Sequence, residues 1–257
     1  MPPTRQSVTL RFSSRVENYI NHRPSYPHGV IETLVTECGL AEKSVVADIG
    51  SGTGMLAELF LKNGNRVFAV EPNREMREAG ERLLKKYPRF TSIEGTAEAT
   101  TLTDRSIDFV TAGQAFHWFD RQQARSEFSR ILKLGGWVAL VWNERQTEAS
   151  LFLRAYEDLL HNYGTDYEAV DHRHVDRSTI AAFFAPHPLE LRRFANQQVL
   201  DFDGVRGRLL SSSYTPEPGH PNYQPMIEAL RAIFEKYQVG SKVTFEYVTL
   251  LYYSHLV

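Results

Sequence analysis

The chain has 257 residues, a net charge of −2 and a pI near 6.5, and 42% of its residues are hydrophobic and 23% charged. This composition is ordinary for a globular protein and argues against disorder, and the length suits one large α/β domain or two small ones. Proteins that bind nucleic acid usually carry a clear basic excess, which is missing here, so we expect no nucleic-acid partner.

No disulfide, signal segment or membrane span is expected. Cys38 is the only cysteine, so an intramolecular disulfide is impossible, and its apolar setting is typical of a buried core thiol. The first residues, MPPTRQSV, have no apolar signal core, and apolar runs such as Val138–Trp142 are too short to span a bilayer. We therefore expect a cytoplasmic protein without membrane insertion, and the oligomeric state is left open.

The sequence up to Trp142 predicts alternating helices and strands. Val16–Leu40 reads as helix, bend and helix, because the prolines of HRPSYP (His22–Pro27) forbid a continuous helix. Short apolar runs then predict strands at Val45–Ile49, Arg66–Val70, Phe90–Glu94, Ile107–Ala112 and Gly136–Trp142. Helical stretches lie between them at Gly54–Asn63, Arg74–Lys86 and Gln122–Leu132. Strands joined by single helices imply right-handed crossovers and a parallel sheet covered on both faces.

The sequence after Trp142 has a different pattern. Leu151–Tyr163 and Tyr223–Tyr237 have helical spacing. Leu189–Leu200 and Lys242–Tyr253 have alternating character and predict an antiparallel pair added to the sheet. The stretch Asp201–Gly240 is then a helical excursion between these two strands.

A glycine-rich turn follows the first predicted strand. ADIGSGTGMLAELF places Gly50, Gly52 and Gly54 between that strand and a helix, where the turn needs unusual backbone angles and a ligand must approach the main chain closely. Glu71 ends the next strand about twenty residues later, where an acidic side chain can accept hydrogen bonds from ribose hydroxyls. Together these features predict a site for a nucleoside-containing cofactor.

The spacing of the glycines favours one cofactor. Dinucleotide sites usually have G-x-G-x-x-G, which brings a helix N-terminus onto a pyrophosphate, whereas this loop has G-x-G-x-G preceded by Asp48. A carboxylate beside the loop would repel a pyrophosphate but can position a cofactor that carries an ammonium or sulfonium cation. We therefore expect S-adenosyl-L-methionine rather than NAD.

From about Phe12 to Trp142 the sequence resembles the class I S-adenosylmethionine-dependent methyltransferases, in the group that includes the ubiquinone/menaquinone and trans-aconitate methyltransferases. VVADIGSGTG is similar to the first family motif, whose backbone holds the methionine part of the cofactor, and VFAVEPN to the second, at the ribose. GTAEATTLTDRSIDFV resembles the segment beside the adenine, with Thr96 where the family usually has aspartate. GQAFHWFD and LKLGGWVALVW, with Leu134 where proline is common, match the segments around the fourth and fifth strands.

The resemblance implies a role for particular residues. Gln114 would close over the methionine end, and YINHRPSYP is similar to an N-terminal cap that would bring Tyr19, Arg23 and Tyr26 near the cofactor. The expected cofactor-binding residues are Arg23, Asp48, Gly50, Ser51, Gly52, Gly54, Glu71, Pro72, Asn73, Ala97, Glu98 and Gln114.

The resemblance also implies the architecture: an α/β, Rossmann-like, seven-stranded and mostly parallel sheet with an antiparallel last strand and helices on both faces. We expect an N-terminal helical cap (1–40), a cofactor-binding core (41–145) and a C-terminal part (146–257) that completes the sheet and supplies a helical substrate lid. In that lid Arg206, Arg208, Ser211 to Ser213 and Tyr214 could bind a polar or anionic acceptor.

Candidates for the reacting end lie in Phe116, His117, Trp118 and Phe119, after the carboxyl end of a parallel strand, where open α/β sheets place their sites. His117 could accept a proton or bind a carboxylate, and Trp118 could present a π face to a sulfonium; packing roles are the alternative for both. Arg23 is a candidate for binding a carboxylate. The pair His172 and His174, without cysteine or helical spacing, makes a poor zinc site, so no metal is expected.

Three functions remain open. The leading one is methyl transfer from S-adenosylmethionine to a small-molecule acceptor, such as a carboxylate or another polar metabolite, through oxygen, nitrogen or carbon. The alternatives are an NAD-dependent oxidoreductase, which the glycine spacing and Asp48 disfavour, and a non-catalytic S-adenosylmethionine-binding protein.

Overall fold

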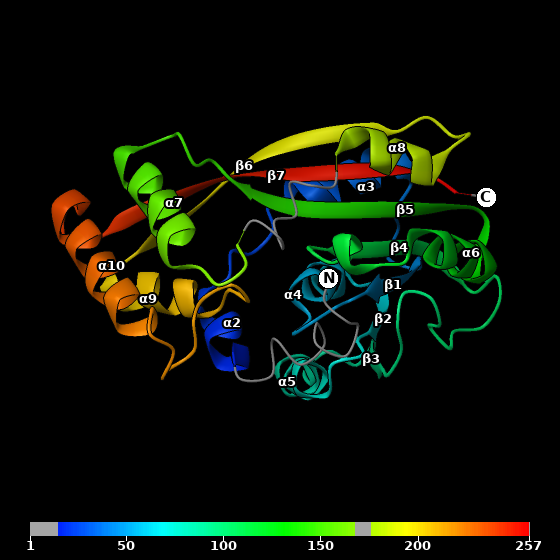
Figure 1. Cartoon of the computed structure of the whole chain (residues 1–257). Helices are drawn as coiled ribbons and strands as arrows, with labels where there is room; N and C mark the ends of the chain where they lie inside the picture. Colours follow the sequence, from blue (N-terminus) through cyan, green and yellow to red (C-terminus); the bar gives the residue numbers. More distant parts are fainter. Residues whose placement is uncertain (1–14, 168–175, 257) are drawn as a thin grey trace. The chain divides into compact units, whose positions relative to one another are not determined.

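The computed structural model describes residues 15–167 and 176–256. Its seven-stranded sheet has the order β3-β2-β1-β4-β5-β7-β6 (Figure 1). The strands are β1 (Val45–Ile49), β2 (Arg66–Val70), β3 (Phe90–Ile93), β4 (Ile107–Gly113), β5 (Leu132–Arg145), β6 (Glu190–Leu200) and β7 (Val243–His255). The first five pair in parallel and the last strands run antiparallel, so the expected Rossmann-like fold class is confirmed.

The helices follow the predicted pattern closely. They are α2 (Val16–His22), α3 (Gly29–Cys38), α4 (Met55–Lys62), α5 (Arg74–Leu84), α6 (Arg121–Ile131), α7 (Leu151–Tyr163), α8 (Arg177–Phe184), α9 (Phe202–Leu210) and α10 (Tyr223–Tyr237). Helix α8 was not predicted from the sequence. Its start is nevertheless marked by an N-cap, because Asp176 accepts a hydrogen bond from the backbone N–H of Thr179 at 2.7 Å.

Two compact units that interleave in the sequence make up the chain. Unit 1 consists of residues 1–24, 144–171 and 195–248, and unit 2 of residues 25–143, 172–194 and 249–257. The long strands β5, β6 and β7 each contribute residues to both units. The expected division at residues 40 and 145 stays a prediction.

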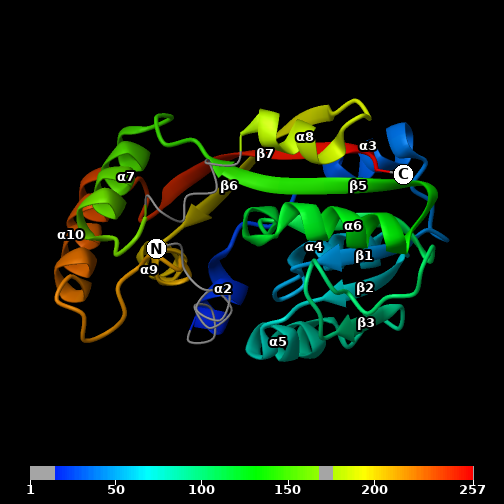
Figure 2. The same ribbon diagram turned by 45° about the vertical axis from the view of Figure 1, so that its right-hand side comes forward.

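Unit 2 has a hydrophobic core on each face of its strands. Ala47 and Ile49 of β1 pack into one cluster with the apolar residues of α6 and α8, while the intervening Val46 packs into the other with α3 and α4. Figure 2 shows α5 beside β3 at the end of this series of strands. Strands that are covered on both faces leave only their ends for a ligand, and the candidate site lies at the carboxyl ends.

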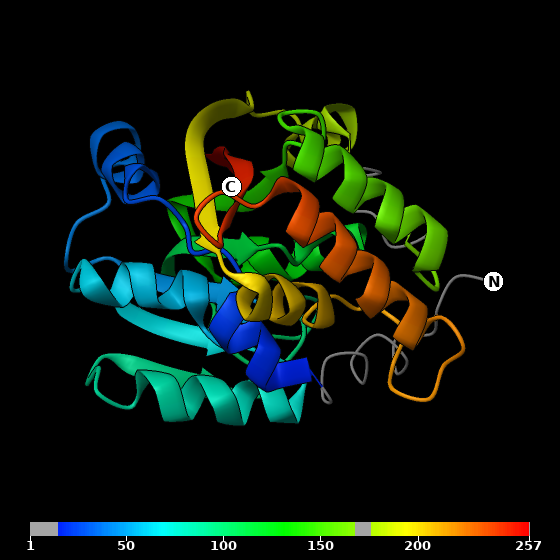
Figure 3. The ribbon, with the colours of Figure 1, turned by 90° about the vertical axis from the view of Figure 1, so that its left-hand side faces the viewer.

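Unit 1 is built around helices. Buried apolar side chains of α7, α9 and α10 form its core together with Val243, Phe245 and Tyr247 at the start of β7. Figure 3 shows α10 (orange) alongside α7 (green), and α2 (blue) against α9 (yellow). Across the described residues, no helix combines the length and the apolar character that crossing a bilayer requires.

Candidate functional site

The glycine loop adopts the backbone angles that the sequence predicts. Gly50, Gly52 and Gly54 have φ values of +65°, +56° and +85°, in the left-handed region that side chains disfavour. The N–H groups of Gly50 and Ser51 donate to the carbonyl of Val70 at 2.9 and 3.1 Å, which ties the loop after β1 to the end of β2.

Glu71 joins the two loops at the ends of these strands. Its Oε2 accepts a hydrogen bond from the N–H of Gly52, and its Oε1 accepts one from the N–H of Asn73, each at 2.8 Å. Asn73 then caps α5 by accepting from the N–H of Met76, and Pro72 between them is exposed. Each carboxylate oxygen has a second lone pair, so Glu71 can hold the loop and still accept hydrogen bonds from a sugar. Burial raises the pKa of Glu71, and the two backbone donors oppose that rise.

Two glycines of the loop differ in what surrounds them. A Cβ atom at Gly54 would lie 2.4 Å from Cδ1 of Leu84, whereas a Cβ at Gly52 would meet no atom within 4 Å. The structure therefore leaves room at Gly52, where the sequence places a ligand against bare backbone, and packs α5 closely against Gly54.

This contrast predicts different effects for two matched substitutions. Gly54→Ala should lower the free energy of unfolding by about 2–4 kcal/mol, because left-handed strain adds to a clash with Leu84. Gly52→Ala should lower the free energy of unfolding only by the strain, about 1–2 kcal/mol. It should also weaken binding of S-adenosylhomocysteine by about 10-fold, because the added methyl group enters the open space where we expect the ligand. Denaturant titration and calorimetric titration of both variants check this. Equal loss of stability in the two variants would contradict it.

Two buried oxygen atoms near the loop are acceptors that make no well-formed hydrogen bond with the described residues. Asp48 is fully buried at the end of β1, where its Oδ1 accepts from the hydroxyl of Thr111 at 3.0 Å; the backbone N–H of Ala57 also acts on the carboxylate, but Oδ2 has no hydrogen bond of good geometry. Gln114 follows β4 with φ of +55°, donates from Nε2 to the carbonyl of Asn143 at 3.1 Å, and leaves its Oε1 buried without a partner. Unsatisfied acceptors fit a ligand that donates hydrogen bonds, such as an ammonium group, and not a pyrophosphate.

The titration of Asp48 predicts how stability depends on pH. Burial raises the pKa of Asp48 from 3.8 to about 7, although hydrogen bonds from the Thr111 hydroxyl and the Ala57 backbone oppose the rise. The unfolded chain loses this proton near pH 4 and the folded chain near pH 7, so the stability of the unliganded protein should fall as the pH rises between these values and level off above. Asp48→Asn should flatten this part of the profile. Denaturation from pH 4 to 8 measures it, and an unchanged slope in the variant would argue against the assignment.

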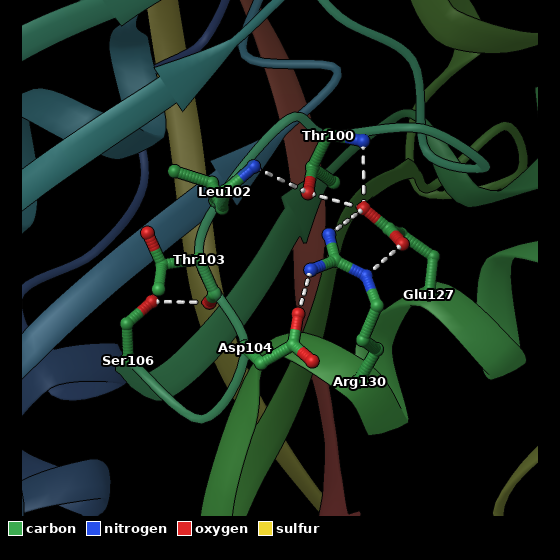
Figure 4. Close-up of polar contacts among 7 residues, drawn as sticks. All are labelled: Thr100, Leu102, Thr103, Asp104, Ser106, Glu127 and Arg130. Carbon is green, nitrogen blue, oxygen red and sulfur yellow. Dashed lines mark hydrogen bonds and ion pairs between the residues drawn. The ribbon is translucent and has the colours of Figure 1, made fainter.

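The segment expected beside the adenine is held by a polar network. Ala97 is buried, and Glu98 accepts a hydrogen bond from the N–H of Asp120 at 2.8 Å, while Thr96 is exposed. Figure 4 shows the network that anchors the following residues to α6. Its bonds join Thr100, Glu127, Arg130 and Asp104. Burial acts to raise the pKa of Glu127, but the hydrogen bonds from the side chains of Arg130 and Thr100 outweigh it and lower the pKa to about 2. The network therefore stays ionised at neutral pH.

His117 and Trp118 lie in a 3-10 turn, Phe116–Trp118, directly after the end of β4. Their rings are half-buried with centroids 4.6 Å apart, while Phe116 is fully buried and packs edge-to-face on Trp142. The buried Phe116 thus fixes the turn, and the two candidate side chains are left partly accessible at the carboxyl end of a parallel strand.

The N-terminal candidates are divided between the units. Tyr26 belongs to unit 2, and a Cβ atom at Gly113 would lie 2.6 Å from its hydroxyl, so it sits at the end of β4. Tyr19 and Arg23 belong to unit 1, where the Arg23 guanidinium lies over the Tyr19 ring and donates to the carbonyl of Ser211. Their expected place near the cofactor stays a prediction. His172 and His174 lie outside the described residues.

Sequence reasoning missed two residues that shape the site. Thr111 donates the hydrogen bond to Asp48. The carbonyl of Asn143 accepts a hydrogen bond from the side chain of Gln114, and Nδ2 of Asn143 donates to the carbonyl of Ser25 at 3.2 Å. Asn143 directly follows the apolar run VALVW, and a polar residue at the carboxyl end of a parallel strand could have indicated a place in the site. Within residues 15–167 and 176–256, no three His, Cys, Asp or Glu side chains gather as metal ligands.

Known proteins match the same part of the chain. A family described as Methyltransferase domain matches residues 47–140. An uncharacterized methyltransferase of Mycobacterium tuberculosis is 39% identical over 145 residues, which cover 56% of this chain and 57% of that protein. An uncharacterized methyltransferase of Schizosaccharomyces pombe is 36% identical over 135 residues, 52% of this chain and 53% of the relative. The chain thus spans about half the length of the curated relatives it matches.

The fold has solved counterparts as well. A protein of Anaeromyxobacter dehalogenans, assigned as a type II methyltransferase, is 22% identical, covers 91% of this chain and 98% of its own, and has a TM-score of 0.66. Residues 47–140 thus match a methyltransferase domain, the relatives similar to this chain are methyltransferases over about half their length, and the chain shares its fold with a protein assigned as a methyltransferase.

Proposed function

We propose that the chain is an enzyme that transfers a methyl group from S-adenosyl-L-methionine to a small-molecule acceptor. The observation that carries the proposal is the junction of β1 and β2: Glu71 fixes the N–H of Gly52 at 2.8 Å, while the space beside Gly52 is open. A ligand there meets bare backbone on one side and a carboxylate suited to ribose hydroxyls on the other. The family match supports the same cofactor.

The residues around this junction fit the parts of that cofactor. In our proposal Asp48 and Gln114 accept hydrogen bonds from the ammonium of its methionine end, Glu71 and Asn73 bind its ribose, and Ala97 contacts its adenine. When bound, the cofactor would supply a methyl group on a sulfonium sulfur: a lone pair of the acceptor forms the new bond to the methyl carbon, the carbon–sulfur bond breaks, and the sulfur is left as a neutral thioether.

The protein's contribution to such a transfer is mainly alignment. The leaving group is good, so holding the acceptor in line and excluding water is worth on the order of 7–11 kcal/mol. In our proposal His117 takes the proton that the acceptor loses where the attacking atom carries one, and Trp118 packs beside it. The acceptor is a small polar metabolite, in line with the absence of a basic excess in the composition.

Two measurements test the proposal in sequence. A thermal-shift titration should show stabilisation by S-adenosylhomocysteine and none by NAD; stabilisation by NAD alone would point to an oxidoreductase. Incubation with cofactor labelled in its methyl group and a small-molecule extract should then move label into a metabolite. Binding without any transfer of label would leave a cofactor-binding protein without catalysis.

A further inference from the structure

Unit 1 contains arginine side chains whose hydrogen bonds, among the described residues, include none to a carboxylate. Arg208 of α9 is only 5% exposed, and its hydrogen bonds run from Nε to the hydroxyl of Tyr247 at 3.2 Å and from Nη1 to the hydroxyl of Ser212 at 3.1 Å. Both partners are neutral. A buried guanidinium that faces only neutral groups is destabilising, so an arrangement of this kind favours binding of an anion.

Arg23 shares one of these partners. Its Nη2 donates to the carbonyl of Ser211 at 2.9 Å and approaches the Ser212 hydroxyl at 3.5 Å, while its Nε is buried without a hydrogen-bond partner among the described residues. Because Arg23 and Arg208 meet the same hydroxyl, the two guanidinium groups are neighbours. Burial lowers the pKa of Arg23, and the positive charge of Arg208 adds to the effect, so the two cations repel each other in the unliganded protein.

Aromatic hydroxyls complete the cluster. Burial acts to raise the pKa of Tyr214, but the positive charges of Arg145, Arg208 and Arg23 and a hydrogen bond with Ser212 outweigh it and lower the pKa. Tyr156 is fully buried, and its hydroxyl finds no partner within the described part of the chain. Both phenols can donate a hydrogen bond to an anion.

Arg145 differs from the other two arginines. Its guanidinium forms an ion pair with Glu157, donates to the hydroxyl of Tyr167 at 2.9 Å and lies over the ring of Tyr156. The charge of Arg145 is therefore already compensated by Glu157, and its contacts help to hold Tyr167 and Tyr156 in position. Arg206, on the same helix as Arg208, is exposed, so the structure does not bring this candidate into the cluster.

We propose that Arg23 and Arg208, with Tyr214 and Ser212, form a binding site for an oxyanion, the carboxylate or phosphate group of a small molecule. The planar fork of each guanidinium matches the two oxygens of such a group, and charge-assisted bonds of this kind are about twice as strong as neutral ones. Binding would remove the repulsion between the two arginines and satisfy the free Nε of Arg23. The site lies within unit 1 and does not depend on methyl transfer.

Calorimetric titration of the full chain with inorganic phosphate and, separately, with citrate tests the inference, with chloride at the same ionic strength as reference. The wild-type protein should bind one of the two anions above the chloride background, and the anion that binds more tightly shows whether the site takes a phosphate or a carboxylate. Arg208→Lys, which keeps the charge but loses the fork, and Arg23→Gln should each weaken binding by about 10- to 100-fold. Arg206→Gln should bind as wild type does.

Several outcomes would overturn the site. The first is that neither anion binds wild type above the chloride background. The second is that Arg208→Lys and Arg23→Gln both bind the anion as well as Arg206→Gln does. The third is a phenolate absorbance at neutral pH, which would show that an ionised Tyr214 already supplies the negative charge. S-adenosylhomocysteine is titrated into the same samples. Its binding by Arg208→Lys and Arg206→Gln shows that these variants are folded and separates a failure of this site from a failure of the proposed cofactor site. Arg23 is itself an expected cofactor-binding residue, so the folding of Arg23→Gln is checked by thermal denaturation instead.

Discussion

Replacing Glu71 with alanine should weaken the binding of S-adenosylhomocysteine by about 100-fold or more and also destabilise the unliganded protein. The carboxylate accepts the N–H groups of Gly52 and Asn73, each at 2.8 Å, in a buried position. Its loss leaves two backbone donors unsatisfied, at about 1–3 kcal/mol each, and removes the acceptor for the ribose. Affinity should therefore fall through both loop geometry and lost contacts.

Two further variants separate these contributions. Glu71→Gln keeps one acceptor oxygen but turns an amide N–H toward Gly52 or Asn73, so it should bind the ligand nearly as poorly as alanine does. Glu81→Gln changes an exposed glutamate of α5 and should alter neither property. Affinity and denaturation midpoints of the three proteins are the measurements. Wild-type affinity in Glu71→Gln would remove Glu71 from the ribose site.

The sequence predicted the cofactor half of the sheet well because burial on both faces leaves a strong pattern there. VVADI and RVFAV coincide with β1 and β2 to the residue, since each is a mostly apolar run, with Asp48 and Arg66 as the exceptions, that turn residues bound. The glycine loop was also readable, because positive φ angles admit few residues other than glycine. Local chemistry was sufficient for both.

Other features required the tertiary structure. Helix α8 is only eight residues long, so RSTIAAFF shows little more than two turns of periodicity. β5 begins at Leu132, because a register shift lets Leu132 pair with Ile107, which a sequence pattern does not reveal. The positive φ of Gln114 was equally invisible, since glutamine rarely adopts it.

The arginine cluster of unit 1 shows the same limit. Arg208 and Tyr214 were named from the sequence as candidates in a polar lid, but Arg206 had an equal claim. Only the packing of α9 tells them apart, since it buries Arg208 and exposes Arg206. Arg23 comes from a segment far away in the sequence, and its contact with Ser212 follows from the fold of unit 1 alone.

Replacing His117 with alanine should lower the turnover of labelled cofactor with the small-molecule extract by about 100-fold, which is the lower range for a general base. The ring lies half-buried beside Trp118 on a turn that the buried Phe116 holds in place, so its removal should leave the loop structure intact. Affinity for S-adenosylhomocysteine should therefore stay close to that of wild type, and the loss should appear in turnover.

A base can be told from a packing residue by chemical rescue. Added imidazole should restore part of the turnover of His117→Ala, because a free base can enter the space that the ring has left and take the proton, whereas a lost packing contact would not respond. His28→Ala removes a histidine whose side chain is 72% exposed in the same unit and should change nothing, since its contact with Glu32 is a surface pair. Turnover at the wild-type level in His117→Ala would assign the proton to solvent and leave alignment as the protein's whole contribution to the chemical step.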